Sequence, residues 1–149
     1  MKKIHLQSGF TLLEVMMALL ILSVALLGLA SLSSTVIQNN SYSNNYTTAT
    51  LLAQDKLEEL LNRAFTHVDL EDANTANNTT ADFFSTVVFD SQDTQVDETG
   101  TAGAAGGVFT RTVNIWPVSS TRKDIAVILT WEDDQGNTRT VSLSTIKSS

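Results

Sequence analysis

The residue with the most unusual setting is a single acid in a long apolar stretch. From Phe10 to Leu32 the sequence reads FTLLEVMMALLILSVALLGLASL, and Glu14 is its one charged residue. A charge near the centre of a membrane helix costs about 2.5–3.5 kcal/mol, and less near an end. Thr11-x-x-Glu14 matches a capping box, in which the carboxylate satisfies a backbone N–H at the positive end of the helix dipole. Capping explains how the charge is tolerated, but not why Gly9 and an aromatic residue stand before it.

The rest of the chain lacks the residues that common catalytic centres need. It has no cysteine, which excludes disulfides and thiolate metal sites. The chain has only two histidines, His5 and His67. They are too few for a histidine metal cluster, and they cannot supply a Ser-His-Asp arrangement and leave further histidines for a metal. The glycine-rich stretch 100–107 lacks the Lys-Ser/Thr of a phosphate-binding loop. We therefore expect no enzymatic activity, no cofactor and no metal site.

Three acidic clusters, at residues 69–72, 90–98 and 132–134, carry oxygen ligands of the kind that Ca²⁺ prefers. None of them has the spacing of an EF-hand loop. A run of charged residues is usually a solvated turn. We interpret the clusters as turns, and calcium binding by one of them remains an alternative.

The apolar stretch is long enough for a membrane-spanning helix. At about 1.5 Å per residue, residues 10–32 make a helix about 34 Å long, and a bilayer core is about 30 Å thick. Lys2, Lys3 and His5 precede the stretch, so the positive-inside tendency predicts a cytoplasmic N-terminus and export of everything after Leu32. An ordinary secretory signal peptide has a shorter apolar stretch, followed by small residues at its cleavage site. An ordinary signal anchor fits the length equally well.

The string Gly9-Phe10-Thr11-Leu12-Leu13-Glu14-Val15 follows a short basic segment and opens the apolar stretch. In this arrangement it resembles the class III signal of type IV prepilins and pseudopilins. The resemblance implies that residues 1–9 are a leader peptide, which a prepilin peptidase removes by cutting between Gly9 and Phe10. The peptidase, acting also as a methyltransferase, would then methylate the new amine of Phe10. Glu14 would be the assembly carboxylate, which pairs with the N-terminal amine of a neighbouring subunit.

Electrostatics agrees with the assembly role that the resemblance gives to Glu14. An ammonium group and a carboxylate attract strongly in low dielectric, and each costs far more to bury alone than as a pair. Such a pair favours one axial stagger between neighbouring helices, so Glu14 would set the register of assembly. The implied partners are other major and minor pilins, contacted through the N-terminal helix, and the lipid of the inner membrane.

The charge of the chain excludes one class of partner. Loss of residues 1–9 removes two of the nine Lys and Arg side chains and none of the 16 Asp and Glu side chains, which leaves a net charge of −9. Binding to nucleic acid needs clustered basic residues. We expect no nucleic-acid partner.

The helix is expected to continue beyond the membrane segment. No Gly or Pro interrupts residues 29–64, and apolar residues recur there at every third or fourth position. The apolar stripe comprises Tyr42, Tyr46, Ala49, Ala53, Leu57, Leu60 and Ala64, widened by Leu52 and Leu61, and the opposite face carries Gln54, Asp55, Glu58, Glu59 and Asn62. We expect a transmembrane and filament-core helix at 10–32 and an amphipathic helix at 33–65. Residues 38–48 are rich in Asn, Ser and Thr, which allows fraying or a kink there.

The C-terminal part reads as a small antiparallel sheet. Residues 66–107 form a variable loop region with one expected strand at Phe83–Phe89, and residues 108–149 form the sheet. The strands expected there are Val108–Trp116, Ile125–Trp131 and Thr138–Ile146, with a hairpin loop at 132–137 and with Pro117 either ending its strand or lying on an edge. The odd-numbered positions from Ile125 to Trp131, with Val141 and Leu143, share one face. The predicted fold is therefore α+β, the pilin fold, with a long N-terminal helix packed against this sheet.

Two segments indicate a subtype. Residues 51–60, LLAQDKLEEL, and the C-terminal strands with their acidic turn resemble the V-type minor pilins, and the I-type minor pseudopilin of type II secretion is similar in the helix. The resemblance implies a minor subunit that takes part in assembly or initiation of a type IV pilus, located first in the bacterial inner membrane and then in the pilus. A minor pseudopilin is the first alternative, and a single-pass anchored binding domain that never polymerises is the second.

Overall fold

The structure is a computed structural model that describes residues 10–149. The expected leader peptide, residues 1–9, lies outside the described residues, and so does Gly9. The chain divides between Ser41 and Tyr42 into two compact units, and helix α1 (Leu12–Asn62) runs through both. The second unit, Tyr42–Ser149, also contains a four-stranded sheet and two 3-10 turns, η1 (Val68–Leu70) and η2 (Thr75–Asn77).

The first unit is the N-terminal part of α1, which starts with a capping interaction. The Thr11 hydroxyl accepts a hydrogen bond from the backbone N–H of Glu14 at 3.3 Å, which is one half of the predicted capping box. The other half, a hydrogen bond from a backbone N–H to the Glu14 carboxylate, does not form within residues 10–149. The helix then continues without interruption through Gly28 and through the polar stretch 38–48, so the fraying or kink that the composition allows does not occur there. Hydroxyl groups inside it bond to carbonyls of the preceding turn, for example Ser23 to the carbonyl of Leu20 at 2.8 Å. These polar side chains are thus satisfied within the helix itself.

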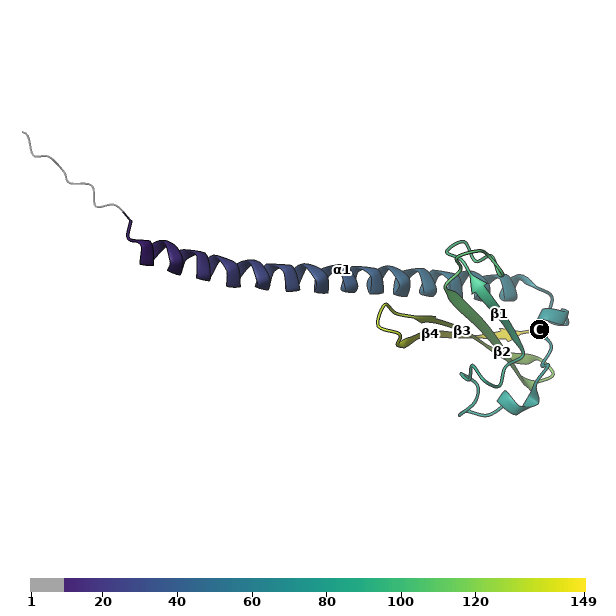
Figure 1. Ribbon diagram of the computed structural model, residues 1–149. Helices are drawn as coiled ribbons and strands as arrows, with labels where there is room; N and C mark the ends of the chain where they lie inside the picture. The colour runs from purple at the N-terminus through teal and green to yellow at the C-terminus, as the bar shows by residue number, and fades with distance from the viewer. Residues whose placement is uncertain (1–9) are drawn as a thin grey trace, which may run out of the picture. The chain divides into compact units, whose positions relative to one another are not determined.

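The part of α1 in the second unit lies along the sheet (Figure 1). It packs there through a narrow stripe of side chains. Its buried residues are Ala49, Leu52, Ala53, Leu57 and Leu60, all of which the periodicity predicted. The predicted polar face is exposed over its whole length. Four predicted members of the stripe are exposed. Ala64 is exposed because the helix ends at Asn62, and Leu61 stays 38% exposed at the flank of the stripe. Tyr42 and Tyr46, which precede the first buried residue Ala49, are 42% and 47% exposed.

The sheet consists of β1 (Ser91–Val96), β2 (Phe109–Ser119), β3 (Arg122–Glu132) and β4 (Thr138–Ser148). All neighbours are antiparallel, in the order β1-β2-β3-β4. The three predicted C-terminal strands are present and are longer than expected, and the hairpin lies between Glu132 and Thr138 as expected. The α+β fold with a long N-terminal helix and a small antiparallel sheet is therefore confirmed.

The core lies between the stripe of α1 and one face of the sheet. The odd-numbered residues of β3 from Ile125 to Trp131 are all buried there, and Val141 of β4 joins them opposite Leu129. Leu143 is partly buried against the same cluster. The alternation of side chains along a strand therefore placed these residues correctly.

Pro117 does not end its strand, because the N–H that proline lacks would point away from β3 and is not needed for the pairing of β2 with β3. The backbone N–H of Ile115 donates to the carboxylate of Asp90, so it points away from β3. Pro117 lies two residues further along β2 and has the same orientation. It pairs with Lys123, while β1 reaches only as far as Val113 on the other side. The proline thus occupies an edge position, which was one of the two expected outcomes.

The prediction of a strand at Phe83–Phe89 is wrong. This segment forms turns, which cover the face of the sheet that does not contact α1. The side-chain amide of Asn114 donates to the carbonyls of Phe83 at 2.8 Å and Ser85 at 3.0 Å, and the rings of Phe83 and Trp116 lie 6.0 Å apart. Asn114 and Trp116 belong to the even-numbered face of β2, opposite the core. The hydrophobic run is therefore a cover for that face, and the edge strand next to β2 is the polar β1.

Candidate functional site

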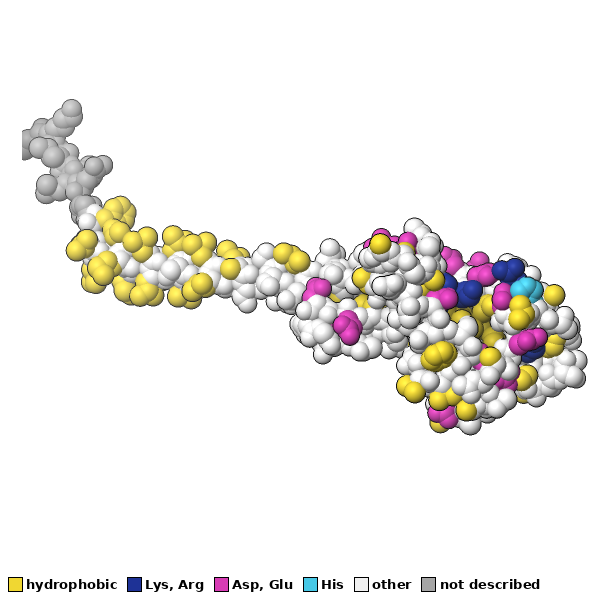
Figure 2. Space-filling model, turned by 45° about the vertical axis from the view of Figure 1, so that its right-hand side comes forward, with side chains coloured by type: hydrophobic (Ala, Val, Ile, Leu, Met, Phe, Trp, Pro, Cys, Tyr) yellow, Lys and Arg dark blue, Asp and Glu magenta, His cyan; other side chains and the backbone are white. Residues whose placement is uncertain are grey.

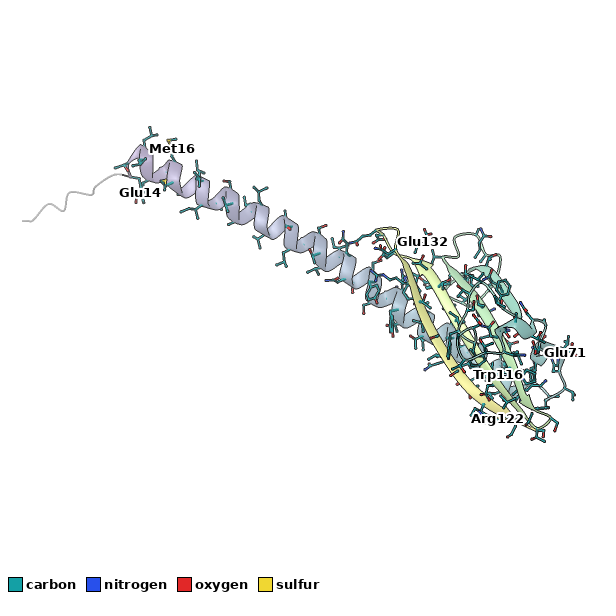
Figure 3. The ribbon with its side chains drawn as sticks, turned by 90° about the horizontal axis from the view of Figure 1, so that it is seen from below. Glu14, Met16, Glu71, Trp116, Arg122 and Glu132 are labelled. Carbon is teal, nitrogen blue, oxygen red and sulfur yellow. The ribbon has the colours of Figure 1, made fainter. Side chains whose placement is uncertain are left out.

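The residues that the N-terminal motif singles out lie at the first turn of α1. Glu14 is an acidic residue in this turn, where the helix dipole favours a negative charge (Figure 3). Phe10 and Glu14 are four positions apart, and both line a shallow groove with Val15, Ala18, Leu19 and Leu22. The structure thus brings Phe10 and Glu14 to one side of the chain. Gly9, the third predicted residue of this site, is not described.

The groove opens on the N-terminal part of α1, whose apolar side chains pack against no other element within residues 10–149. Every residue from Phe10 to Asn40 is exposed, and Phe10 itself is 84% exposed. Hydrophobic side chains cover this part of the helix in Figure 2. The helix is long and apolar enough to cross a membrane. Between Phe10 and Gln54 only Glu14 is charged. If lipid or other apolar helices surround this segment, the Glu14 carboxylate is therefore the one side chain in it that requires an ionic partner.

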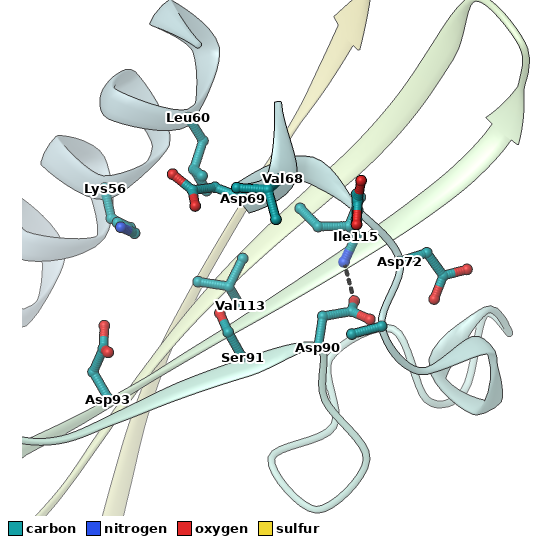
Figure 4. A pocket seen from close by; sticks show the side chains of 12 residues that line it. Lys56, Leu60, Val68, Asp69, Asp72, Asp90, Ser91, Asp93, Val113 and Ile115 are labelled. Carbon is teal, nitrogen blue, oxygen red and sulfur yellow. Dashed lines mark hydrogen bonds between the residues drawn. The ribbon is translucent and has the colours of Figure 1, made fainter. Parts of the chain in front are cut away.

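The acidic residues of the second unit are used to hold loops. A cleft of about 430 Å³ is lined by Asp69, Glu71, Asp72, Asp90 and Asp93 among others (Figure 4). At its floor the Asp90 carboxylate accepts hydrogen bonds from the backbone N–H groups of Asn74 and Ile115 and from the amide of Asn77. Asp90 therefore ties the segment before β1 to the edge of β2.

Asp97, in the same 90–98 cluster, and Asp133, in the 132–134 cluster, hold turns of the same kind. The Asp97 carboxylate accepts from the hydroxyl and backbone of Thr99 and from the backbone N–H of Thr101, and the Thr99 hydroxyl in particular lowers the pKa of Asp97. Asp133 accepts from the backbone and side chain of Asn137 and from Arg139. These bonds, with the Asn137 backbone N–H as the largest cause, hold the pKa of Asp133 at about 2.

Within residues 10–149, no group of three or more His, Asp and Glu side chains is arranged to hold a metal ion. The acidic clusters were interpreted as turns, and the hydrogen bonds of Asp90, Asp97 and Asp133 agree with that interpretation. The role of Asp90 was not anticipated. Its partners are up to 25 residues away along the chain, so no local pattern indicates them.

Replacing Asp90 by alanine is expected to lower the free energy of unfolding by about 2–3 kcal/mol, because it leaves backbone and amide donors without an acceptor. The control is Asp134→Ala, since Asp134 is exposed and takes part in no hydrogen bond or ion pair within the described chain. Thermal or denaturant unfolding of the two variants measures the difference. Equal stability of both variants would contradict a structural role for Asp90.

Comparison with known proteins gives one match, at the N-terminus. Residues 4–30 match a family model described as the prokaryotic N-terminal methylation motif. This motif implies processing by a prepilin peptidase and assembly with pilins in general, and the pilin-type family consists of structural subunits. Searches of curated proteins and of solved structures found no match. The methylation motif, together with the long apolar helix and the four-stranded antiparallel sheet, fits a membrane-anchored protein of the type IV pilin-like kind.

Proposed function

We propose that the chain is a minor pilin of the V type, a structural subunit that takes part in assembly or initiation of a type IV pilus. One observation carries the proposal. A single carboxylate, Glu14, stands in the first turn of α1, at the start of the apolar segment 10–32 whose residues are all exposed, and this turn lies inside the methylation motif. A helix with this surface needs lipid before assembly and other helices after it.

The proposed sequence of events follows the motif. The chain enters the inner membrane through residues 10–32, with its N-terminus in the cytoplasm and residues 33–149 in the periplasm. The prepilin peptidase cuts between Gly9 and Phe10, and methylation of the Phe10 amine follows. The processed subunit then leaves the lipid and joins the filament, with its apolar helix in the filament core.

Glu14 aligns the subunit during this transfer. Its carboxylate pairs with the N-terminal ammonium of a neighbouring subunit, and the low dielectric of the helix core makes the pair stronger than it would be in water. A slip of one helical turn, about 5.4 Å, separates the two charges and leaves both without a partner. The pair therefore favours one axial position between neighbouring helices.

The second candidate is a minor pseudopilin of a type II secretion system, because the same motif and fold serve both kinds of filament. Under this alternative the roles of Gly9, Phe10 and Glu14 are unchanged. A single-pass anchored domain that never polymerises is the third candidate. It predicts a chain that keeps residues 1–9.

Deletion of this chain distinguishes the two filaments. A minor pilin is expected to be needed for normal pilus number, and it should occur in sheared pili in smaller amounts than the major subunit. Electron microscopy counts the pili, and quantitative mass spectrometry of the sheared fraction gives the ratio of subunits. Normal pili combined with blocked export of secreted proteins would contradict the pilus assignment and favour the pseudopilin.

A further inference from the structure

Residues 33–41 of α1, called the neck below, lie between two parts of the helix that are held in place. On one side is the apolar segment, which is long enough to cross a membrane. On the other side the sheet holds the helix: the Arg139 guanidinium lies 5.2 Å from the ring centre of Tyr42, and the rings of Tyr46 and Trp131 lie 6.5 Å apart. The neck is the stretch of α1 that neither lipid nor the sheet supports.

The neck packs against nothing within the described chain. Residues 33–40 are exposed, and Ser41 is partly exposed. The boundary between the two compact units falls directly after Ser41, and the first buried residue of α1 is Ala49. Most helices in proteins owe their stability to the packing of one face. The stability of the neck therefore depends on its own sequence.

That sequence is unfavourable for a helix. The neck reads SSTVIQNNS, and eight of its nine residues are Ser, Thr, Val, Ile or Asn, which form helices less readily than Ala, Leu, Glu or Lys. Val and Ile lose side-chain freedom in a helix, and Ser, Thr and Asn offer the backbone other hydrogen bonds. The Thr35 hydroxyl donates to the carbonyl of Ser31 at 3.2 Å, a kind of bond that slightly destabilises helices.

Ion pairs do not compensate for this composition. A helix that is exposed all round can be held by ion pairs between side chains three or four residues apart. The other end of α1 has such pairs, in which Glu59 lies 3.0 Å from Lys56 and 3.0 Å from Arg63. The neck contains no charged residue, and none lies between Glu14 and Asp55. It therefore lacks ion pairs as well as packing.

The parts of α1 on either side of the neck resist opening. In lipid no water can replace a broken backbone hydrogen bond, so the membrane segment stays helical even at Gly28, its weakest helix former. From Ala49 onwards, opening would expose the side chains of the hydrophobic core to water. Opened backbone groups of the neck, in contrast, are hydrated at once. Opening of α1 therefore requires least free energy in the neck.

We propose that the neck is a hinge: α1 opens there locally and reversibly, and the domain changes its orientation and its distance from the membrane segment while both stay folded. The continuous helix of the structure is the closed form. Full opening would lengthen these nine residues from about 14 Å to at most about 30 Å. A subunit that leaves lipid for a filament meets new surroundings at its anchor and at its domain, and the hinge lets the two settle separately.

Amide hydrogen exchange of the full chain in detergent micelles tests the hinge residue by residue. We expect the amides of residues 34–41 to exchange at least about 100-fold faster than those of residues 18–30 and 53–60. Detergent protects the first of these flanking stretches, and packing on the sheet protects the second. Equal protection of all three stretches would overturn the proposal.

A variant with a better helix former at five exposed neck positions tests the cause. It carries Ser33→Ala, Ser34→Ala, Thr35→Ala, Asn39→Ala and Asn40→Ala. We expect exchange of the neck amides to slow by about tenfold or more, because each replacement favours the helix and none removes a packing contact. Unchanged exchange would contradict the argument from composition.

The matched control is the double variant Asn44→Ala with Thr47→Ala. Both positions are exposed, and both lie in the part of α1 that the sheet holds. The same kinds of replacement there should change exchange in the neck by less than about twofold. An effect as large as that of the neck variant would show that stability is shared along the whole helix, and it would count against a local hinge.

Two spin labels measure the movement itself. The chain has no cysteine, so Leu27→Cys and Gln54→Cys introduce single labelling sites at exposed positions on either side of the neck. An unbroken helix holds these two Cα atoms about 40 Å apart. We expect a broad distance distribution with the natural neck and a narrow one near 40 Å with the alanine neck. A narrow distribution with the natural neck would overturn the proposal.

The hinge rests on the membrane anchoring of the chain and not on its assembly into a filament. The experiments in micelles need neither removal of residues 1–9 nor a second subunit. A rigid neck would therefore leave the proposed pilin function standing, and absence of the chain from filaments would leave the hinge standing.

Discussion

Replacing Gly9 by valine should abolish removal of residues 1–9, so that the protein accumulates in the membrane at its full length. A peptidase must approach the backbone closely at the bond that it cuts, and glycine has no Cβ to obstruct that approach. Valine places two methyl groups directly before the Gly9–Phe10 bond. Its branched side chain also restricts the backbone. We expect nearly complete loss of processing, which the intact mass of the membrane-extracted protein measures.

The matched control for this variant is Ser8→Val, the same new side chain one residue earlier, which should be processed normally. Both variants should insert in the membrane, because the apolar stretch from Phe10 is unchanged. Normal loss of residues 1–9 in Gly9→Val would contradict the predicted cleavage position. Equal failure of both variants would show only a general sensitivity of the leader, and it would count against a special role for Gly9.

Replacing Glu14 by valine should leave processing intact and strongly reduce incorporation into filaments. The substitution removes one partner of the proposed pair and leaves the neighbour's ammonium buried without a counter-charge, which typically costs about 3–5 kcal/mol. This corresponds to a loss of incorporation of about two to four orders of magnitude at equal subunit concentration. Quantitative mass spectrometry of membrane and sheared-filament fractions measures the change.

Two controls separate this effect from helix capping. Glu14→Gln keeps the size and most hydrogen-bonding capacity of the side chain but loses its charge, so it should fail to incorporate in the same way. Met16→Val adds a branched residue to the same turn and should incorporate normally. Wild-type filament content of Glu14→Val would reduce Glu14 to a residue that stabilises the first helical turn by about 0.3–1 kcal/mol.

The sequence was informative where structure depends on near neighbours. The capping interaction of Thr11 and the buried stripe from Ala49 to Leu60 both follow from spacings of three and four residues along the chain. The N-terminal site was predicted for the same reason, since its residues lie within one contiguous string. Its functional roles remain predictions that the variants above test.

The sequence was misleading where structure depends on distant contacts. Phe83–Phe89 has the composition of a strand, yet its carbonyls bond to the side chain of Asn114, about 30 residues later. The edge strand β1 has the sequence SQDTQV, whose polar side chains gave no strand signal. Strand propensity describes a fit to a half-buried surface, and which segment lies at that surface is decided by the whole fold.

The central claim is that the mature protein begins at a methylated Phe10 and enters a filament through the helix that follows. Intact-mass and N-terminal peptide analysis of the wild-type protein, from both the membrane and the sheared-filament fraction, tests it most directly. The account predicts a chain that lacks residues 1–9, carries one added methyl group on the amine of Phe10, and occurs in the filament fraction. A protein that retains Met1, Lys2 and Lys3 and is absent from that fraction would contradict it.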